Sequence, residues 1–377
     1  MTTASIAPAD LLDLVRDLQP RASVFLHAVP KAVDLDIGED LRTRWRKLAE
    51  QLRAQGIDKP TLAVIEQHIA ALAVTPVAAA GYALLASAGT IHLAQPMPGV
   101  VTADRARYSA PPELLPLLAW WQQHPAYVSV LIDRAGAEVT AVPAAALAGN
   151  TVTVTGPDDE IERNAPGGWA QARYQRRAED SWHHNAVAVA QSAVEAFDAV
   201  KADLLVIAGD VRAVQMLRDH LHKHVRRDLH VSVVRGGRSP DGSTQAHLRA
   251  VADAVAEYAN TRTAALLDQS TSSPIGDAVE GVPATLAALA EGRLQTLFVT
   301  GEPASERQAW AGPGILCTER PQATPDVPLI AGGLADIAVR AALLTGASVH
   351  VLTAAQAAAF DGHIGGLCRY RPAPAVS

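Results

Sequence analysis

The densest group of residues that could do chemistry lies in the segment PGGWAQARYQRRAEDSWHH, from Pro166 to His184. It opens with two adjacent glycines, Gly167 and Gly168, whose backbone can adopt conformations closed to other residues. Cationic and aromatic side chains follow within a few positions, namely Trp169, Arg173, Tyr174, Arg176, Arg177, Trp182, His183 and His184. Guanidinium groups pair with phosphates and aromatic rings stack on bases, so this pattern indicates a mobile tip that docks on RNA.

A structural reading of the same residues stays open. Gly167 and Gly168 would then form a flexible connector before a helix, and Glu179 and Asp180 would balance the arginines on a solvated helix surface. On local grounds the two readings are equal, so the choice between them depends on the rest of the chain.

A second cationic segment favours the RNA reading. Residues 212–238 hold seven cations, which are Arg212, Arg218, Lys223, Arg226, Arg227, Arg235 and Arg238, against only Asp219 and Asp228. Because the whole chain carries a formal net charge of −7, this segment stands out as a concentration of positive charge. Such local charge predicts an anionic partner bound with salt-sensitive affinity, and RNA is the partner we expect.

Other chemistries have weaker support. His220 and His224 of HLHKH share a helix face, but no Cys, Glu or third ligand stands near them, so no metal site is predicted. The segment VIAGD precedes a helix without Gly-x-Gly-x-x-Gly or Gly-Lys-Ser/Thr, so no nucleotide cofactor is predicted. The sequence also offers no serine elbow, no plausible paired carboxylates and no Cys/His dyad in a supporting context.

Composition and length favour a multi-domain cytoplasmic protein. The chain has 377 residues, of which 49% are hydrophobic, and this predicts two or three well-buried domains. Cys317 and Cys368 can form neither a disulfide framework nor a four-ligand zinc site, which fits a reducing compartment. The N-terminus lacks the basic region that precedes the apolar run of a signal peptide. Residues 67–103 are uncharged, but prolines and glycines interrupt them, so we expect buried strands there and no membrane span.

Hydrophobic periodicity predicts three α/β segments that would position these residues. The first, residues 1–123, is a mixed αβ domain with strands at 22–29, 81–88 and 90–95 and helices at 38–56, 59–73 and 111–123. The second, residues 124–260, is a three-layer α/β domain with a mixed sheet, whose elements are a hairpin at 126–144, strands at 150–156, 202–210 and 229–237, and helices at 170–200, 211–225 and 243–260. The third, residues 261–377, is an αβα sandwich with helices at 281–292 and 330–346, strands at 295–300, 314–319, 348–353 and 362–370, and surface loops at 303–314 and 320–328.

This order of elements and motifs resembles the archaeal and eukaryotic class-I release factor and Pelota family, whose bacterial relatives include the hibernation factor Balon. The segment from Gly167 to Phe197 is similar to the family stretch that begins Gly-Gly-Gln and continues through Arg-Phe-x-Arg into a long helix with a His-Asn pair. Its counterparts in this chain are Gly167, Gly168, Arg173, Tyr174, Arg176, His184 and Asn185. The match is fairly specific in residues 124–260, and in the flanking segments it rests mostly on the order of elements.

Departures from the family pattern bear on activity. Trp169 stands where release factors have their catalytic glutamine, and its side chain has no amide to orient water. Gln171 offers an amide two residues later, although on a regular helix it would face about 200° away from position 169. The segment EDLRTRWRKLAEQL stands in the region of the family's stop-codon loop and lacks an Asn-Ile-Lys-Ser type of motif. Stop-codon decoding is therefore not expected.

Two functions from different classes follow from the resemblance. The first is a ribosome-binding factor that occupies the vacant A site and shields the decoding and peptidyl-transferase centres during stress, with elongation factor Tu as a candidate partner. The second is a peptidyl-tRNA hydrolase that uses Gln171 to rescue stalled ribosomes. A Pelota-like splitting factor and an unrelated RNA-binding role are further alternatives. The residues expected to contact ribosomal RNA are Gly167, Gly168, Trp169, Gln171, Arg173, Tyr174, Arg176, Arg177, His183, His184, Arg212, Lys223, Arg226, Arg227, Arg235 and Arg238.

Overall fold

The structure is a computed structural model. It describes residues 8–27, 37–72, 81–98, 101, 103–133, 135–155, 169–224, 229–238, 244–274, 277–301, 307–322 and 328–371. These form two compact units, one made of Gln123–Ala264 and the other of Met1–Gln122 together with Ala265–Ser377. The predicted multi-domain α/β class is confirmed, because helices alternate with four separate sheets. The division into three independent domains stays a prediction, since its first and third segments cluster together here.

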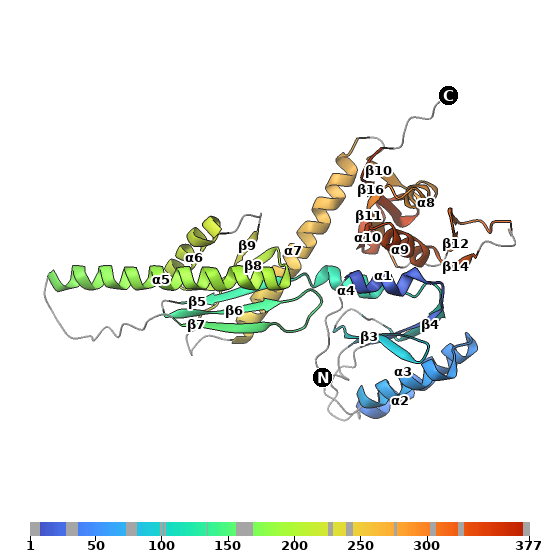
Figure 1. The fold of residues 1–377 in the computed structure, drawn as a ribbon, viewed down its shortest axis with the longest axis horizontal. Coiled ribbons are helices and arrows are strands. Elements are labelled where there is room, and N and C mark those ends of the chain that lie inside the picture. Colours follow the sequence, from blue (N-terminus) through green and yellow to red (C-terminus); the bar gives the residue numbers. More distant parts are fainter. Residues whose placement is uncertain are drawn as a thin grey trace. The chain divides into compact units, whose positions relative to one another are not determined.

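The N-terminal segment is an antiparallel sheet with two helices on one face. Its elements are α1 (Pro8–Arg16), β1 (Arg21–Leu26), α2 (Ile37–Ala54), α3 (Lys59–Leu72), β2 (Tyr82–Ser87), β3 (Thr90–Pro96), β4 (Arg105–Ser109) and α4 (Leu115–Gln123). The strands lie in the order β3-β2-β1-β4, and every neighbouring pair is antiparallel. Helices α2 and α3 cover one face (Figure 1), where the predicted stripe of Leu41, Trp45, Leu48 and Leu52 is buried.

Two elements of this segment were not predicted. Strand β4, with the sequence RARYS, carries its charges at alternate positions, and no apolar stripe reveals it. Helix α1 was overlooked although its buried residues Leu11, Leu14 and Val15 stand at helical spacing. Both elements are held by tertiary contacts, since β4 pairs with β1 and α1 packs against a helix of the C-terminal segment.

The central unit is a mixed five-stranded sheet between helices. Its elements are β5 (Tyr127–Ile132), β6 (Gly136–Val142), β7 (Asn150–Thr155), α5 (Trp169–Val200), β8 (Leu204–Gly209), α6 (Val211–His224), β9 (His230–Val233) and α7 (Thr244–Ser272). The strand order is β7-β6-β5-β8-β9, in which β5, β8 and β9 are parallel and β6 and β7 are antiparallel. The predicted mixed sheet and layered arrangement are thereby confirmed.

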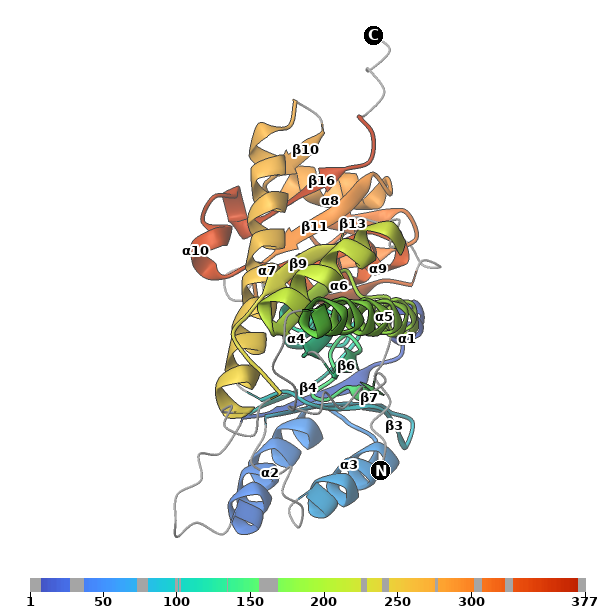
Figure 2. The same ribbon diagram turned by 90° about the vertical axis from the view of Figure 1, so that its left-hand side faces the viewer.

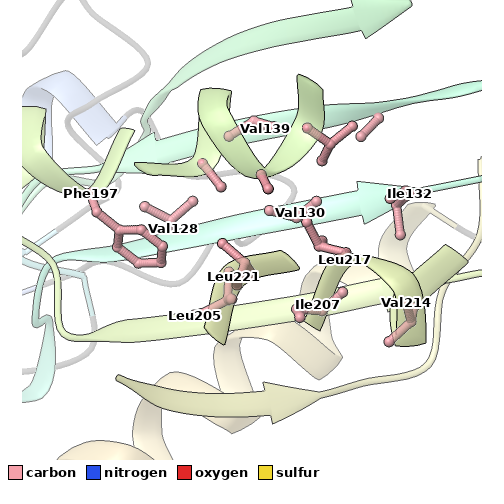
Figure 3. Close-up of a cluster of buried hydrophobic side chains, with 14 of the residues drawn as sticks. Val128, Val130, Ile132, Val139, Phe197, Leu205, Ile207, Val214, Leu217 and Leu221 are labelled. Atoms are coloured by element: carbon pink, nitrogen blue, oxygen red, sulfur yellow. The ribbon is translucent and has the colours of Figure 1, made fainter. Parts of the chain in front are cut away.

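Each face of this sheet has its own core. On one face, α5 and α6 lie next to each other, as Figure 2 shows with α5 nearly end-on, and they pack on β5, β6 and β8. Figure 3 shows the centre of that core, in which the ring of Phe197 lies over Val128 and Leu205. On the other face, Val251, Val255 and Tyr258 of α7 cover Leu204 and Val206. Since alternate residues of β8 point to opposite faces, an almost wholly apolar strand is what this position requires.

Helix α7 is longer than the sequence predicted. The predicted helix ended at Asn260, but the observed one continues to Ser272, and the expected domain boundary between residues 260 and 261 stays a prediction. No glycine or proline stands between Thr244 and Ser273, and nothing therefore breaks the helix. Leu266 and Leu267 continue its apolar surface into a different core, beside Phe298 of the C-terminal segment.

The C-terminal segment contains two small sheets. Its elements are β10 (Ala278–Glu280), α8 (Val282–Ala290), β11 (Leu294–Val299), β12 (Gln308–Gly312), β13 (Ile315–Cys317), β14 (Ile330–Gly333), α9 (Leu334–Leu344), β15 (Ser348–Val351), α10 (Ala354–Ala357) and β16 (Ile364–Cys368), with a short 3₁₀ turn at Asp361–His363 before β16. The strand orders are β10-β16-β11-β15 and β13-β12-β14. Phe298 of β11 packs against α7 and α10, while α8 and α9 pack on the sheets as well, in keeping with the predicted αβα arrangement.

Two assignments in this segment were wrong. Gln308–Gly312, expected within a surface loop, forms β12 at the middle of the three-stranded sheet, because Ala309 and Ala311 alternate into the interior. Ile330–Gly333, expected to begin a helix, forms strand β14 paired with β12. The buried residues are Ala309 and Ala311 in β12 and only Ile330 in β14, and so few and mostly small residues give a periodicity too weak to identify a strand.

Candidate nucleic-acid interface of the central unit

The long helix α5 carries the sequence that we singled out first. It begins at Trp169, so Gly167 and Gly168 lie outside the described residues. The side chains of residues 169–183 also lie outside the described part of the structure. These include Trp169, Gln171, Arg173, Tyr174, Arg176, Arg177 and His183, and only their place on the helix backbone is known.

The start of α5 points away from the sheet. A short turn joins the end of α5 to β8, so the helix runs opposite to β8 and its start lies at the end of the sheet where β8 stops. With 32 residues, α5 is about 48 Å long, whereas a six-residue strand spans about 20 Å. Figure 1 shows the first half of α5 extending beyond the sheet. The fold thus places the backbone of Trp169 and of the arginines that follow it in the part of α5 that extends beyond the sheet.

The second half of α5, from Ala186 to Val200, holds the helix on the sheet. From Ala186 onward, Val189, Ala190, Ala193 and Phe197 are fully buried against the sheet and α6. Asn185 is only 5% exposed, while its neighbour His184 is exposed, so the two residues of the expected His-Asn pair lie on different sides of the helix. His184 is therefore on the exposed side of α5, whereas Asn185 belongs to the packed base.

The same end of the sheet is where the parallel strands β5, β8 and β9 terminate. Gly209 closes β8 with φ 138°, and a Cβ atom there would lie 1.7 Å from the carbonyl oxygen of Ile132, so only glycine fits. The next residue, Asp210, begins α6 by accepting hydrogen bonds on Oδ1 from the backbone N–H groups of Arg212, at 3.0 Å, and Ala213, at 3.3 Å. This arrangement brings Arg212 to the carboxyl edge, where its side chain is exposed.

Arg238, expected to contact RNA, is engaged inside the unit. Its Nη1 donates to Asp133 Oδ1 at 3.0 Å, and its Nε lies 3.8 Å from Glu138 Oε1. The same Asp133 oxygen accepts from the backbone N–H groups of Ala135 and Gly136, at 2.8 and 3.0 Å. Arg238 therefore ties the segment after β9 to the β5–β6 turn, across the edge where open α/β sheets bind nucleotides.

The other predicted cations divide into three groups. Arg212 and Arg235 are exposed at the carboxyl edge, and Arg218 is exposed on α6. The side chain of Lys223, as well as Arg226 and Arg227, lies outside the described residues. The structure thus brings Arg212 and Arg235 to the end of the unit from which α5 projects, and it assigns Arg238 to a structural contact.

Asp133, which binds Arg238 at the carboxyl edge of the sheet, was not predicted from the sequence. Its signal is the segment Asp-Arg-Ala-Gly after a strand, because an aspartate at that place can accept hydrogen bonds from the turn that follows it. Its pairing with Arg238 joins residues 105 positions apart, and no local pattern reveals such a contact.

The Arg238 contact gives a stability prediction. Arg238→Ala should lower the free energy of unfolding of the central unit by about 1–2 kcal/mol, because it removes a charge-assisted hydrogen bond from a partly buried carboxylate. Arg235→Ala, on an exposed neighbour, should change it by less than about 0.5 kcal/mol. Hydrogen exchange of the β8 amides measures both values in the full chain. Equal effects of the two substitutions would contradict the structural role of Arg238.

The described residues contain neither a membrane-spanning helix nor a cluster of metal ligands. None of the helices described is both long and apolar enough to cross a membrane. In the same part of the chain, no three His, Cys, Asp or Glu side chains come together in a way that could hold a metal ion. His220, one of the histidines of HLHKH, is buried on the inner side of α6 and does not present a surface ligand.

Three kinds of comparison with known proteins give matches, and the family model matches the central part of the chain. Residues 126–273 match the model of Bacterial archaeo-eukaryotic release factor family 2. Uncharacterized protein Rv2629 of Mycobacterium tuberculosis (strain H37Rv) is 23% identical over 272 residues, which cover 70% of this chain and 71% of that protein. Uncharacterized protein MT2704 of Mycobacterium tuberculosis (strain CDC 1551 / Oshkosh) gives the same values.

Several solved structures align at low identity. The archaeal translation termination factor aRF1 is 16% identical, with 96% of this chain and 97% of that chain covered and a TM-score of 0.25. Saccharomyces cerevisiae Dom34 is 9% identical, with 72% of each chain covered and a TM-score of 0.39. Archaeal Pelota, from a model of ribosome-bound Pelota and ABCE1, is 14% identical, with 97% and 94% covered and a TM-score of 0.41. The segment that contains α5 and the cationic carboxyl edge is thus similar in sequence to Bacterial archaeo-eukaryotic release factor family 2.

Proposed function

We propose that this protein is a ribosome-associated, release factor-like translation factor of the cytoplasm. In this proposal the start of α5 enters the vacant A site and silences or protects the ribosome, without reading a stop codon. The observation that carries the proposal is the projection of α5 from a well-packed base, with Trp169 and the positions of three arginines in its projecting part. The family match over residues 126–273, which contain this helix, supports it.

The residue types at the tip favour docking over hydrolysis. A factor that hydrolyses peptidyl-tRNA must position water and stabilise an oxyanion with preorganised donors. Trp169 has no side-chain amide for this task, but its ring can stack on an exposed base or fill a cavity. The arginines that follow would hold phosphates, and elongation factor Tu would be a candidate for delivery. A relation to the hibernation factor Balon in particular is part of this proposal.

Cosedimentation with ribosomes tests the proposal directly. Ribosomes that carry labelled formyl-methionyl-tRNA in the P site and an empty A site are mixed with the protein and pelleted. We expect the protein to pellet while the label stays with the ribosomes. Trp169→Ala should weaken pelleting about tenfold or more, because a base-stacking ring is worth about 1–3 kcal/mol. Ribosomes whose A site is already filled provide the control, and they should retain much less protein.

Other outcomes would assign a different function. Label released into the supernatant, and no longer released after Gln171→Ala, would establish a peptidyl-tRNA hydrolase instead of a silent occupant. Protein that stays in the supernatant, with and without an added delivery factor, would contradict ribosome association itself.

A further inference from the structure

The terminal strand of the central sheet, β7, has one edge with no strand beside it in the described part of the chain. It stands first in the order β7-β6-β5-β8-β9, and β6 is its partner on the inner side (Figure 1). Five of its six residues are exposed, and the remaining one, Val154, packs partly against the core under α5. Among the described residues, no backbone group outside the sheet is hydrogen-bonded to β7. Its outer edge is therefore accessible along its whole length.

The pairing on the inner side determines which backbone groups of β7 point outward. The N–H of Asp133 donates to the oxygen of Gly136 at 2.9 Å, so the backbone groups of Gly136 are directed toward β5. Because this direction alternates along β6, the residues of β6 that are directed toward β7 are those paired with its even-numbered residues. The outward N–H and C=O groups of β7 are therefore those of Thr151, Thr153 and Thr155.

The other edge strands of the described sheets are protected in ways that β7 is not. Natural edge strands avoid pairing with further chains when they are short, charged, irregular or covered. Strands β9, β10, β13 and β14 have only three or four residues each. Strand β4 carries two arginines, β3 contains a register shift and ends in a proline, and the edge of β15 is hydrogen-bonded by Gln122. In contrast, β7 has six residues in unbroken register, without a charge or a proline.

The sequence of β7, NTVTVT, is complementary to a second copy of itself. When two such strands run antiparallel about a two-fold axis at Thr153, this residue lies opposite Thr153 of the second copy, and Thr151 lies opposite Thr155. Every outward N–H group then meets a carbonyl oxygen of the other strand. Val152 lies opposite Val154 at a closely spaced position, where paired β-branched side chains stabilise a sheet. Since neither strand carries a charge, nothing in this register repels the second copy.

The helices of the central unit leave room for a second copy at this edge. Helix α5 packs mainly on β6, one strand in from the edge, and α7 packs on β8, three strands in. Neighbouring strands are about 4.8 Å apart, so the two copies of α5 would be about 14 Å apart. Packed helices are about 8–10 Å apart, so the two copies of α5 do not collide. Val152, which is 49% exposed in a single copy, would be covered between them.

We propose that β7 is the docking edge for a second copy of this protein, so that two central units form one continuous sheet with five strands from each copy. The contact uses the same residues of both copies, as a two-fold axis requires. It consists of backbone hydrogen bonds and paired valines, which is a small contact for two proteins, so the dimer forms reversibly at micromolar concentrations. The assembly stops at two copies, because the strand at the other end of each sheet, β9, has only four residues.

Sedimentation velocity of the full-length protein tests the dimer without ribosomes. We expect a monomer at about 1 μM and mostly dimer at about 200 μM. Thr153→Lys places two lysines opposite each other at the two-fold axis, so it should weaken dimerisation about tenfold or more. Thr90→Lys, the same substitution at an exposed position of the edge strand β3, is the matched control and should dimerise as the wild type does. A wild-type protein that is still monomeric at about 200 μM would overturn the proposal, and so would equal dimerisation of the two variants.

Disulfide formation between two copies tests the strand and its register, and it does not depend on the folding of Thr153→Lys. Residues 152 and 154 of different copies should have Cα atoms about 4.5 Å apart, within the range of a disulfide. A mixture of Val152→Cys and Val154→Cys proteins should therefore form a linked dimer on mild oxidation, several times more than either protein alone. Mass spectrometry locates the bond, since Cys317 and Cys368 are also present. A mixture that is linked no better than the separate proteins would contradict the proposed pairing.

Discussion

Replacing Arg173, Arg176 and Arg177 together by glutamate should lower the affinity for ribosomes by about a thousandfold or more. Each arginine that pairs with a phosphate releases condensed counterions, so three such contacts supply much of the binding free energy at low salt. Glutamates would remove these contacts and add repulsion between the tip and the phosphates. Titration of the protein against vacant ribosomes at several salt concentrations gives the dissociation constants.

The salt dependence separates lost phosphate contacts from a general change in charge. For single-stranded RNA, the slope of log affinity against log salt should become shallower by about 2, or about 0.7 per phosphate. In a matched control, the exposed residues Arg249, Arg262 and Arg320 are replaced by glutamate instead. This control changes the net charge of the protein by the same amount as the tip variant does. If this control weakens binding as much as the tip variant does, the start of α5 has no special role.

Replacing Phe197 by alanine should destabilise the central unit by about 3–5 kcal/mol. Phe197 is 1% exposed and lies between α5 and the sheet, so its removal leaves a cavity at the base of the projecting helix. Hydrogen exchange of the β5 and β8 amides reports the opening free energy of this unit separately from unit 1. Ribosome affinity should fall as well once the unit is partly open at the assay temperature.

Val194→Ala provides the comparison for this prediction. Val194 lies on the same helix face but is only partly buried, so its truncation should cost about 1 kcal/mol. If the Phe197→Ala variant is no less stable than the Val194→Ala variant, the two side chains contribute equally to the free energy of unfolding. That outcome would contradict the assignment of Phe197 as the main anchor of α5.

The sequence predicted elements best where large apolar residues recur at a regular period. Leu41, Trp45, Leu48 and Leu52 identified α2, and the apolar run of β8 identified an interior strand. Where a short strand buries only alanines, as β12 does, or a single large residue, as β14 does with Ile330, the contrast between faces is small and the assignments were wrong. The continuation of α7 past Asn260 depends on a second core that only the folded chain assembles.

The residues of the candidate site were also predicted only in part. Clusters that are contiguous in sequence, such as the arginines after Gly168 and the cations between Arg212 and Arg238, were visible as patterns. Which of these cations would be used within the fold was not visible, because Arg238 finds Asp133 through the closing of the sheet. The ion pair of Arg107 with Asp336 joins residues 229 positions apart, and it appears only when β4 and α9 meet.

Because α5 is long and is held only at its second half, small rotations about the core around Phe197 produce large displacements of its start. About 16 residues precede the packed part that starts near Asn185, which corresponds to an arm of about 24 Å. Over such an arm, a tilt of a few degrees at the base displaces the tip by an ångström or more. The position of the start of α5 is thus determined by side chains in the core of the central unit. Substitutions in the core of the central unit should therefore change the orientation of α5 relative to the sheet before they unfold the protein.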